Sequence, residues 1–234
     1  MLGSLNKNAV IFDMDGVLVD TEPIYTDVNR RLLKRLGVVL SQKRFHSYVG
    51  LSSGYIWSEI RRDFCLRQPV EELVRRERDE LDRHLTALDE IPVMPGVVRL
   101  IETLRDLHFV LGVGSSSAGQ LINMVLAKTG LRPYFNAVVS AEDVTHGKPA
   151  PDIFIEVSAR LGCTPGCSVV IEDSLHGIRA ARSAGMQAIG FQHAHSGNPD
   201  LSEAALVVND FSGHSIEKVV RLVTAIRRHH APEY

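Results

Sequence analysis

The stretch from Ala9 to Gly16, AVIFDMDG, places a short apolar run directly before two aspartates and a glycine. Its first four residues are apolar on both faces, which is typical of a buried parallel strand. Gly16 tolerates the positive φ that a sharp turn after Asp15 requires. Ligands of open α/β sheets bind beyond the carboxyl ends of the strands, so Asp13 and Asp15 mark a candidate site. A pair of turn or cap aspartates would give the same local pattern.

Similar apolar runs recur along the chain, and segments with helical spacing separate them from residue 97 onward. We expect further strands at residues 109–113, 137–139, 168–171, 187–191 and 205–208. We expect helices at residues 97–107, 118–129, 151–161, 175–184 and 215–228. This alternation predicts an α/β fold, a doubly wound, Rossmann-like parallel sheet with right-handed crossovers.

Residues at the expected helix ends support these boundaries. Ser117 and Gln120 have the spacing of a capping box, and Pro151 suits a first helical turn. Three glycines each follow a helix, where a left-handed residue ends it: Gly130, Gly162 and Gly185.

Residues 24–91 break the alternation because they show only helical periodicity. We therefore expect a core domain of residues 1–22 and 93–234 and an all-helical cap insertion of residues 23–92. The insertion carries 13 lysines and arginines and 11 aspartates and glutamates, which indicates solvated helix faces rather than a basic binding patch. Proline-containing connections at both of its ends suit a hinge, so the cap is a candidate lid over the site.

The length of 234 residues fits one core domain with an insertion. Hydrophobic residues make up 44% and charged residues 23%, which excludes a disordered or low-complexity chain. A net charge of −2 provides no field for binding nucleic acid or an anionic membrane. The sequence shows no membrane span or signal peptide, and its three cysteines are unlike a secreted disulfide scaffold. We expect a cytoplasmic monomer that binds neither nucleic acid nor membrane.

Three further motifs stand at the ends of predicted elements. Gly114-Ser115-Ser116-Ser117 follows the second strand and offers hydroxyls and backbone N–H groups at a helix N-terminus, which suits a phosphate. Lys148 lies between Gly147 and Pro149, where proline restricts its backbone. Glu172 and Asp173 follow the fourth strand, and Asp173 or Ser174 is available as a helix N-cap. A role as a helix N-cap would explain Asp173, but it would not also explain Glu172.

Four carboxylates with a single lysine predict a divalent cation. Like charges about 4 Å apart repel by ~4 kcal/mol at an effective dielectric near 20. All-oxygen ligands favour Mg²⁺, which keeps water and substrate phosphate oxygens in its coordination shell.

The four motifs, DMDGVLVDTE, GSSS, KPAP and EDS in this order, resemble those of haloacid dehalogenase (HAD) superfamily phosphatases. The resemblance covers residues 9 to about 191, and the insertion looks like the C1-type helical cap of that family. The strings IFDMDGV and KPAPD are similar to the β-phosphoglucomutase-like branch. The second aspartate favours phosphoester chemistry, because the resemblance implies that dehalogenases and phosphonatases lack it.

The resemblance implies a role for each motif residue. Asp13 would be the nucleophile that forms an aspartyl phosphate, and Asp15 the general acid and base. Ser115, the Ser116 N–H and Lys148 would hold the phosphoryl oxygens beside the Gly16 turn. The expected Mg²⁺ ligands are Asp13, the Asp15 carbonyl, Glu172 and Asp173.

The expected function is Mg²⁺-dependent hydrolysis of a small sugar or polyol phosphate, and a β-phosphoglucomutase-type mutase is the alternative. In β-phosphoglucomutase a histidine follows the first motif and an arginine lies in the first cap loop, where this chain has Tyr25 and Ser53. Both departures favour a phosphatase. Gly50, Ser52 and Ser53 in the cap loop are candidate substrate contacts, although a plain surface turn has the same composition. A non-catalytic binding protein of the same fold is a further alternative, against which the four intact acids argue.

Overall fold

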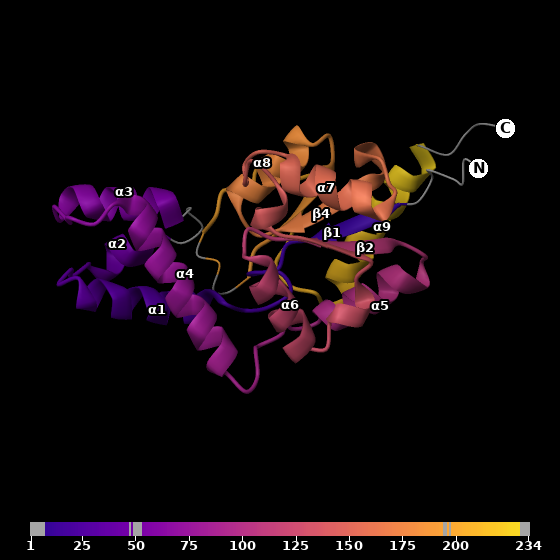
Figure 1. Ribbon diagram of the computed structural model, residues 1–234. Coiled ribbons are helices and arrows are strands. Elements are labelled where there is room, and N and C mark those ends of the chain that lie inside the picture. Colours follow the sequence, from indigo (N-terminus) through magenta and orange to yellow (C-terminus); the bar gives the residue numbers. More distant parts are fainter. Residues whose placement is uncertain (1–7, 47, 49–52, 194–195, 197, 230–234) are drawn as a thin grey trace.

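The computed structural model describes residues 8–46, 48, 53–193, 196 and 198–229. The protein consists of a sheet flanked by helices and a separate group of helices beside it (Figure 1). The six parallel strands lie in the order β3-β2-β1-β4-β5-β6. The strands are β1 (Ala9–Phe12), β2 (Val110–Gly114), β3 (Ala137–Val139), β4 (Ser168–Glu172), β5 (Gln187–Phe191) and β6 (Leu206–Val208). The predicted doubly wound α/β fold is confirmed, and this order is the Rossmann one.

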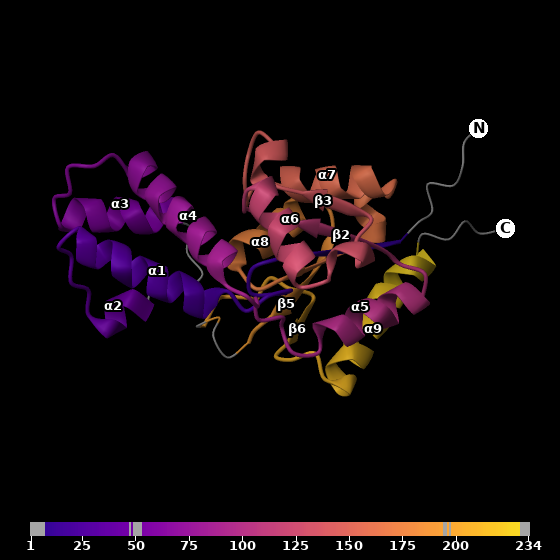
Figure 2. The same cartoon turned by 60° about the horizontal axis from the view of Figure 1, so that its bottom comes forward.

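Helices cover both faces of the sheet, which makes three layers (Figures 1 and 2). One face packs against α7 (Asp152–Leu161) and α8 (Leu175–Ser183). The other packs against α5 (Val97–Asp106), α6 (Gly119–Lys128) and α9 (Gly213–His229). All four residues of β1 are fully buried between these layers, which explains why its sequence does not alternate. Three short 3₁₀ turns complete the core: η1 (Arg132–Tyr134), η2 (Ala141–Asp143) and η3 (Pro165–Cys167).

The structure confirms the left-handed glycines that were predicted after three helices, and it corrects two other predicted helix ends. Gly130, Gly162 and Gly185 all have φ near +70°. The capping box of Ser117 is wrong: α6 has Ala118 at its N-cap with no side-chain cap, because the Ser117 hydroxyl is used elsewhere. Pro151 is the N-cap of α7 and precedes its first helical turn.

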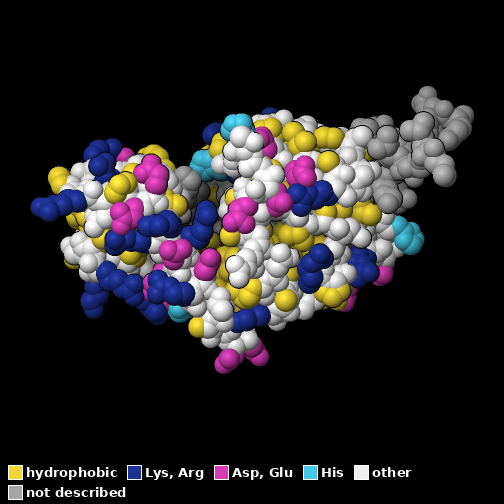
Figure 3. Space-filling view, viewed as in Figure 1, with side chains coloured by type: hydrophobic (Ala, Val, Ile, Leu, Met, Phe, Trp, Pro, Cys, Tyr) yellow, Lys and Arg dark blue, Asp and Glu magenta, His cyan; other side chains and the backbone are white. Residues whose placement is uncertain are grey.

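Residues 22–87 contain only helices among those that the structure describes: α1 (Glu22–Arg35), α2 (Gln42–His46), α3 (Ser53–Asp63) and α4 (Val70–Ala87). These four helices, which we call the cap, enclose a small apolar cluster that includes Trp57, Ile60 and Leu73. Charged side chains of both signs cover the outer surface of the cap (Figure 3). This distribution fits solvated helix faces.

The two connections between cap and core run side by side. The Asp20 N–H donates to the Pro92 carbonyl, and the Met94 N–H donates to the Leu18 carbonyl, each at 2.9 Å. At the end of α4, the Lys128 ammonium on α6 donates to the carbonyls of Thr86 at 2.6 Å and Leu88 at 2.7 Å. The cap is therefore attached to the core by a paired linker, by one lysine and by apolar residues of α1 and α4 that belong to the core cluster.

Candidate active site

The register of the sheet brings three of the sequence motifs to one point. Phe12, the last residue of β1, pairs with Val113 on one side and Ile171 on the other. The residues that follow these three in the chain are Asp13, Gly114 and Glu172, respectively. These residues therefore lie side by side at the carboxyl end of the sheet, where the strand order reverses.

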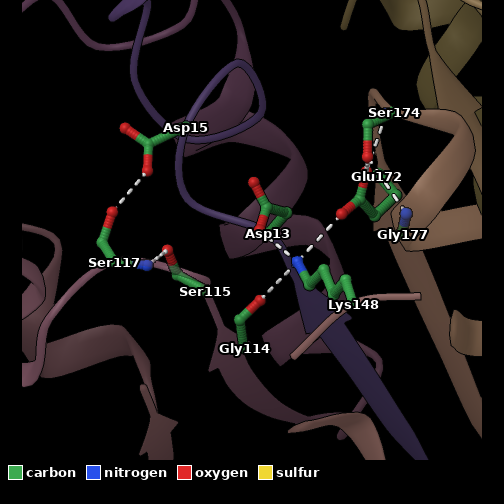
Figure 4. A network of polar contacts seen from close by, with 9 residues as sticks. All are labelled: Asp13, Asp15, Gly114, Ser115, Ser117, Lys148, Glu172, Ser174 and Gly177. Carbon is green, nitrogen blue, oxygen red and sulfur yellow. Dashed lines mark hydrogen bonds and ion pairs between the residues drawn. The ribbon is translucent and has the colours of Figure 1, made fainter. Parts of the chain in front are cut away.

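The Lys148 ammonium lies between Asp13, Gly114 and Glu172 at the carboxyl end of the sheet (Figure 4). Its Nζ is 2.5 Å from Asp13 Oδ1, 2.9 Å from Glu172 Oε1 and 3.0 Å from the Gly114 carbonyl oxygen. Burial acts to lower the pKa of the Lys148 ammonium, but the charges of Asp13 and Glu172 outweigh it and raise that pKa above its usual range. Lys148 is therefore a buried side chain whose charged form is favoured by two neighbouring carboxylates.

The carboxyl of Asp13 experiences opposing effects. Burial raises its pKa, and the nearby carboxylates of Glu172 and Asp15 raise it further, whereas Lys148 lowers it; the result is a pKa of about 7. The single ammonium thus does not compensate for the burial of these acids. The site is electrostatically suited to another cation.

Asp15 is held by two hydroxyl groups. Thr21 Oγ1 donates to Asp15 Oδ1 and Ser117 Oγ donates to Asp15 Oδ2, each at 2.9 Å. Burial raises the pKa of Asp15, and these two hydrogen bonds oppose that rise. The sequence places Ser117 in the serine loop and Thr21 in the first motif, but it does not predict that either hydroxyl binds Asp15. In the sequence, Ser117 could be linked to Asp15 because it follows the end of a predicted strand. Thr21 could be linked to Asp15 because the two residues are close in the chain.

The serine loop lies beside Asp15. Ser115 is buried, and its Oγ accepts a hydrogen bond from the Ser117 N–H at 3.1 Å. Ser116 is exposed on the wall of the same pocket, just before α6. Gly16 has the positive φ that was predicted for the turn after Asp15, with a value of 77°.

Glu172 uses both of its carboxylate oxygens within the protein. Oε1 binds Lys148, and Oε2 accepts from the Ser174 N–H at 2.7 Å and the Ser174 hydroxyl at 2.9 Å. Ser174 is the N-cap of α8, as one of the two predicted caps, and accepts from the Gly177 N–H at 3.0 Å. A Cβ on Gly177 would lie 1.7 Å from Glu172 Oε1, so only glycine leaves room for this carboxylate.

Asp173 lies against the first motif. A Cβ on Gly16 would be 2.0 Å from Asp173 Oδ2, which shows how closely this carboxylate approaches the backbone after Asp15. His193 Nε2 is 3.8 Å from the same oxygen. His195, the other histidine of that loop, lies outside the described residues.

A pocket of about 410 Å³ joins this centre to the cap. Asp13, Asp15 and Lys148 contribute to its core wall, and Tyr25 and Ser53 contribute to its cap wall. The cap and the core meet along a groove on the surface (Figure 3). The predicted contacts Gly50 and Ser52 lie outside the described residues. Trp57 is only 1% exposed and belongs to the apolar cluster of the cap.

The fold and this carboxylate–lysine centre define a protein with a Rossmann-like α/β core, a helical cap and a candidate active site at the carboxyl end of its sheet. The chain belongs to the haloacid dehalogenase-like hydrolase family, whose model matches residues 10–191. It is 36% identical to the fructose-1-phosphate phosphatase of Escherichia coli (strain K12) over 77% of this chain and 94% of that protein. It is 32% identical to a phosphorylated carbohydrates phosphatase of Thermotoga maritima over 85% of this chain and 92% of that protein. The chain is thus an enzyme of the haloacid dehalogenase-like hydrolase family, and both of these relatives are phosphatases, the activity that the motifs of this chain imply.

Solved structures have the same fold. The β-phosphoglucomutase of Clostridium difficile superimposes with a TM-score of 0.76 at 23% identity, covering 94% of this chain and 98% of the other. No helix among the described residues has the length and apolar character needed to cross a bilayer.

Proposed function

We propose that the protein is a Mg²⁺-dependent phosphomonoester hydrolase that acts on a small sugar or polyol phosphate through an aspartyl phosphate. The observation that carries this proposal is the placement of Asp13 beside the Lys148 ammonium and near Asp15, at the base of a pocket that the cap completes. The names of the two relatives, phosphatases of fructose 1-phosphate and of phosphorylated carbohydrates, support the substrate class.

The proposed chemistry proceeds in two displacements. A carboxylate oxygen of Asp13 attacks phosphorus while the bond from phosphorus to the sugar oxygen breaks, and Asp15 transfers its proton to that oxygen. Asp15 then removes a proton from water, whose oxygen attacks the aspartyl phosphate and releases inorganic phosphate and Asp13. The hydroxyls of Thr21 and Ser117 keep the Asp15 carboxyl in place for both steps.

The phosphoryl oxygens would be bound by Lys148, the Ser115 hydroxyl and the Ser116 N–H, with the Gly16 turn closing the site. Lys148 is buried and charged, which strengthens its interaction with a phosphate group. The serine loop precedes α6, so its N–H groups lie at the positive end of that helix.

The residues present fit a magnesium ion. Asp173 lies against the Gly16 backbone, so its carboxylate, that of Asp13 and the Asp15 carbonyl offer oxygen donors on adjoining loops. A bound Mg²⁺ would neutralise charge on the phosphoryl group and its attacking carboxylate. Glu172 belongs to the expected ligand set, but its two oxygens already bind Lys148 and Ser174. We therefore propose that Glu172 positions Lys148.

The cap, residues 23–92, would cover the pocket as a lid on the core of residues 1–22 and 93–234. Tyr25 and Ser53 line the pocket in place of the histidine and arginine of β-phosphoglucomutase. We propose that this wall lets water reach the phosphorylated enzyme, which gives hydrolysis rather than transfer to a second sugar hydroxyl. We also propose a monomeric, cytoplasmic enzyme, and size-exclusion chromatography with light scattering tests its oligomeric state.

The deciding experiment measures phosphate release with Mg²⁺ from a panel of sugar, polyol and nucleotide monophosphates, with Asp13→Asn as the blank. Release from a few sugar or polyol phosphates that stops with chelator supports the proposal. Conversion of β-glucose 1-phosphate to glucose 6-phosphate without release would establish the mutase instead. No turnover of any substrate would favour a binding protein and contradict the proposal.

A further inference from the structure

The cap end of the pocket contains two polar side chains that the chemistry described above does not use. Asn29 on α1 and Asp82 on α4 both line the pocket. In each residue the Oδ1 atom is buried and has no hydrogen-bond partner among the described residues. A buried acceptor without a partner costs about 1–3 kcal/mol, so protein interiors seldom retain one.

Helical spacing explains why these two residues reach the same cavity. Tyr25, Asn29 and Leu33 recur every four residues along α1, and all three line the pocket. Arg78 and Asp82 have the same spacing on α4 and also line it. Because α1 and α4 pack against each other, the polar pair faces the cavity from two adjoining helices.

The cap end of the pocket does not carry the positive charge that an anion-binding site needs. Glu77 is buried in the pocket wall and accepts a hydrogen bond from Trp57 Nε1 at 3.0 Å. Glu77 and Asp82 together oppose the single positive charge of Arg78. Burial raises the pKa of Asp82, Arg78 lowers it, and the nearby acids Asp79 and Glu142 raise it. A second phosphate or a carboxylate on the substrate would meet net negative charge here.

We infer that Asn29 and Asp82 are specificity residues that accept hydrogen bonds from the hydroxyl groups of an uncharged polyhydroxyl substrate moiety. This inference rests on the proposed function and deepens it, because it assigns the half of the substrate that does not react. The volume of about 410 Å³ lies within the range of small-molecule sites. A site built to bind a hydroxyl rejects the analogue that lacks it, since its own polar groups then stay unpaired.

The test compares two six-carbon monophosphates, a hexitol phosphate and n-hexyl phosphate, which differ in their hydroxyl groups. For Asp82→Leu we expect the ratio of kcat/KM between hexitol and hexyl phosphate to fall about tenfold, mostly through KM, as for loss of a hydrogen bond to a charged group. Asn29→Leu should lower the same ratio by a smaller factor. Asp82→Asn, which keeps an acceptor oxygen, should retain most of the wild-type ratio.

Glu71→Leu is the matched control, because Glu71 is exposed on the same helix and does not line the pocket. It should leave the ratio unchanged. Thermal unfolding supplies a second readout: Asn29→Leu and Asp82→Leu should keep or raise Tm, since each removes an unpaired buried acceptor. A purely structural role would lower Tm and reduce turnover of both substrates equally.

A ratio that stays at its wild-type value in both leucine variants would overturn this inference while leaving the proposed function intact. Preference of the wild-type enzyme for a hexose bisphosphate over the monophosphate would also overturn it. Failure of the wild type to release phosphate from either six-carbon ester would instead contradict the proposed function, and the inference with it.

Discussion

Ser117 Oγ lies 2.9 Å from Asp15 Oδ2 and donates a hydrogen bond to it, although 102 positions separate the two residues in the chain. The contact joins the loop after β2 to the loop after β1. Together with Thr21 on the other carboxylate oxygen, it fixes the orientation of the group that we propose as general acid and base.

Removing both hydroxyls, as in Thr21→Val with Ser117→Ala, should lower kcat for a sugar phosphate by roughly tenfold or more because the proton donor is no longer aligned. Turnover of p-nitrophenyl phosphate should fall less, since its leaving group needs little protonation. Steady-state kinetics with both substrates measure the difference. Ser202→Ala, at an exposed serine, is the control, and equal losses on both substrates would contradict the assignment of Asp15.

Asp13→Asn should abolish turnover, because an amide oxygen does not form the aspartyl phosphate. Circular dichroism should show an intact fold. A variant that kept even a tenth of the wild-type rate would exclude Asp13 as the nucleophile. The wild-type enzyme, quenched in acid during turnover, should carry a phosphoryl group that this variant lacks.

Gly177→Ala should reduce both stability and activity, whereas glycine to alanine inside a helix ordinarily stabilises it by up to about 1 kcal/mol. The added methyl group would overlap the Glu172 carboxylate, which holds Lys148. Urea unfolding and kcat measure the two effects. Gly54→Ala is the stability control, because a Cβ at that position meets nothing within 4 Å. A stabilised, fully active Gly177→Ala enzyme would show that Glu172 does not need its observed position.

Lys128→Met should loosen the cap, because its ammonium donates to three carbonyls at the end of α4. We expect a loss of about 1–2 kcal/mol in the free energy of unfolding and faster proteolysis at the linker. Lys218→Met, at an exposed lysine of α9, is the matched control. Identical proteolysis rates for the two variants would rule out an anchoring role.

Asp143 should contribute to stability at neutral pH but not in acid. Hydrogen bonds from the Ser140 hydroxyl, Arg160 and the Ser140 N–H lower the pKa of Asp143 to about 2. Because the folded-state pKa lies below the unfolded value, the contribution is complete above about pH 4 and is lost as the pH falls toward 2. Asp143→Asn should therefore be less stable than the wild type at pH 7, and the gap should narrow at pH 3 in urea titrations. Asp106→Asn, at an exposed site, serves as the control; a gap that widens in acid would contradict this account.

The sequence determined the sheet, the cap and the motif residues because their signals are local. Four consecutive apolar residues predict β1, helical periodicity predicts α1 to α4, and parallel strand ends bring Asp13 and Glu172 to one edge. The same local reasoning gave the wrong capping box for Ser117.

Only the tertiary structure decided how the side chains are paired. Ser117 has the spacing of a cap, yet its hydroxyl binds Asp15. The contacts of Glu172 with Lys148 and Ser174 likewise have no signal in the sequence. Asn29 and Asp82 belong to helices that no motif connects, and their common cavity depends on the packing of α1 against α4. Periodicity fixes which face a residue occupies, but the partner of a side chain depends on distances between elements far apart in the chain, and these arise only when the layers pack.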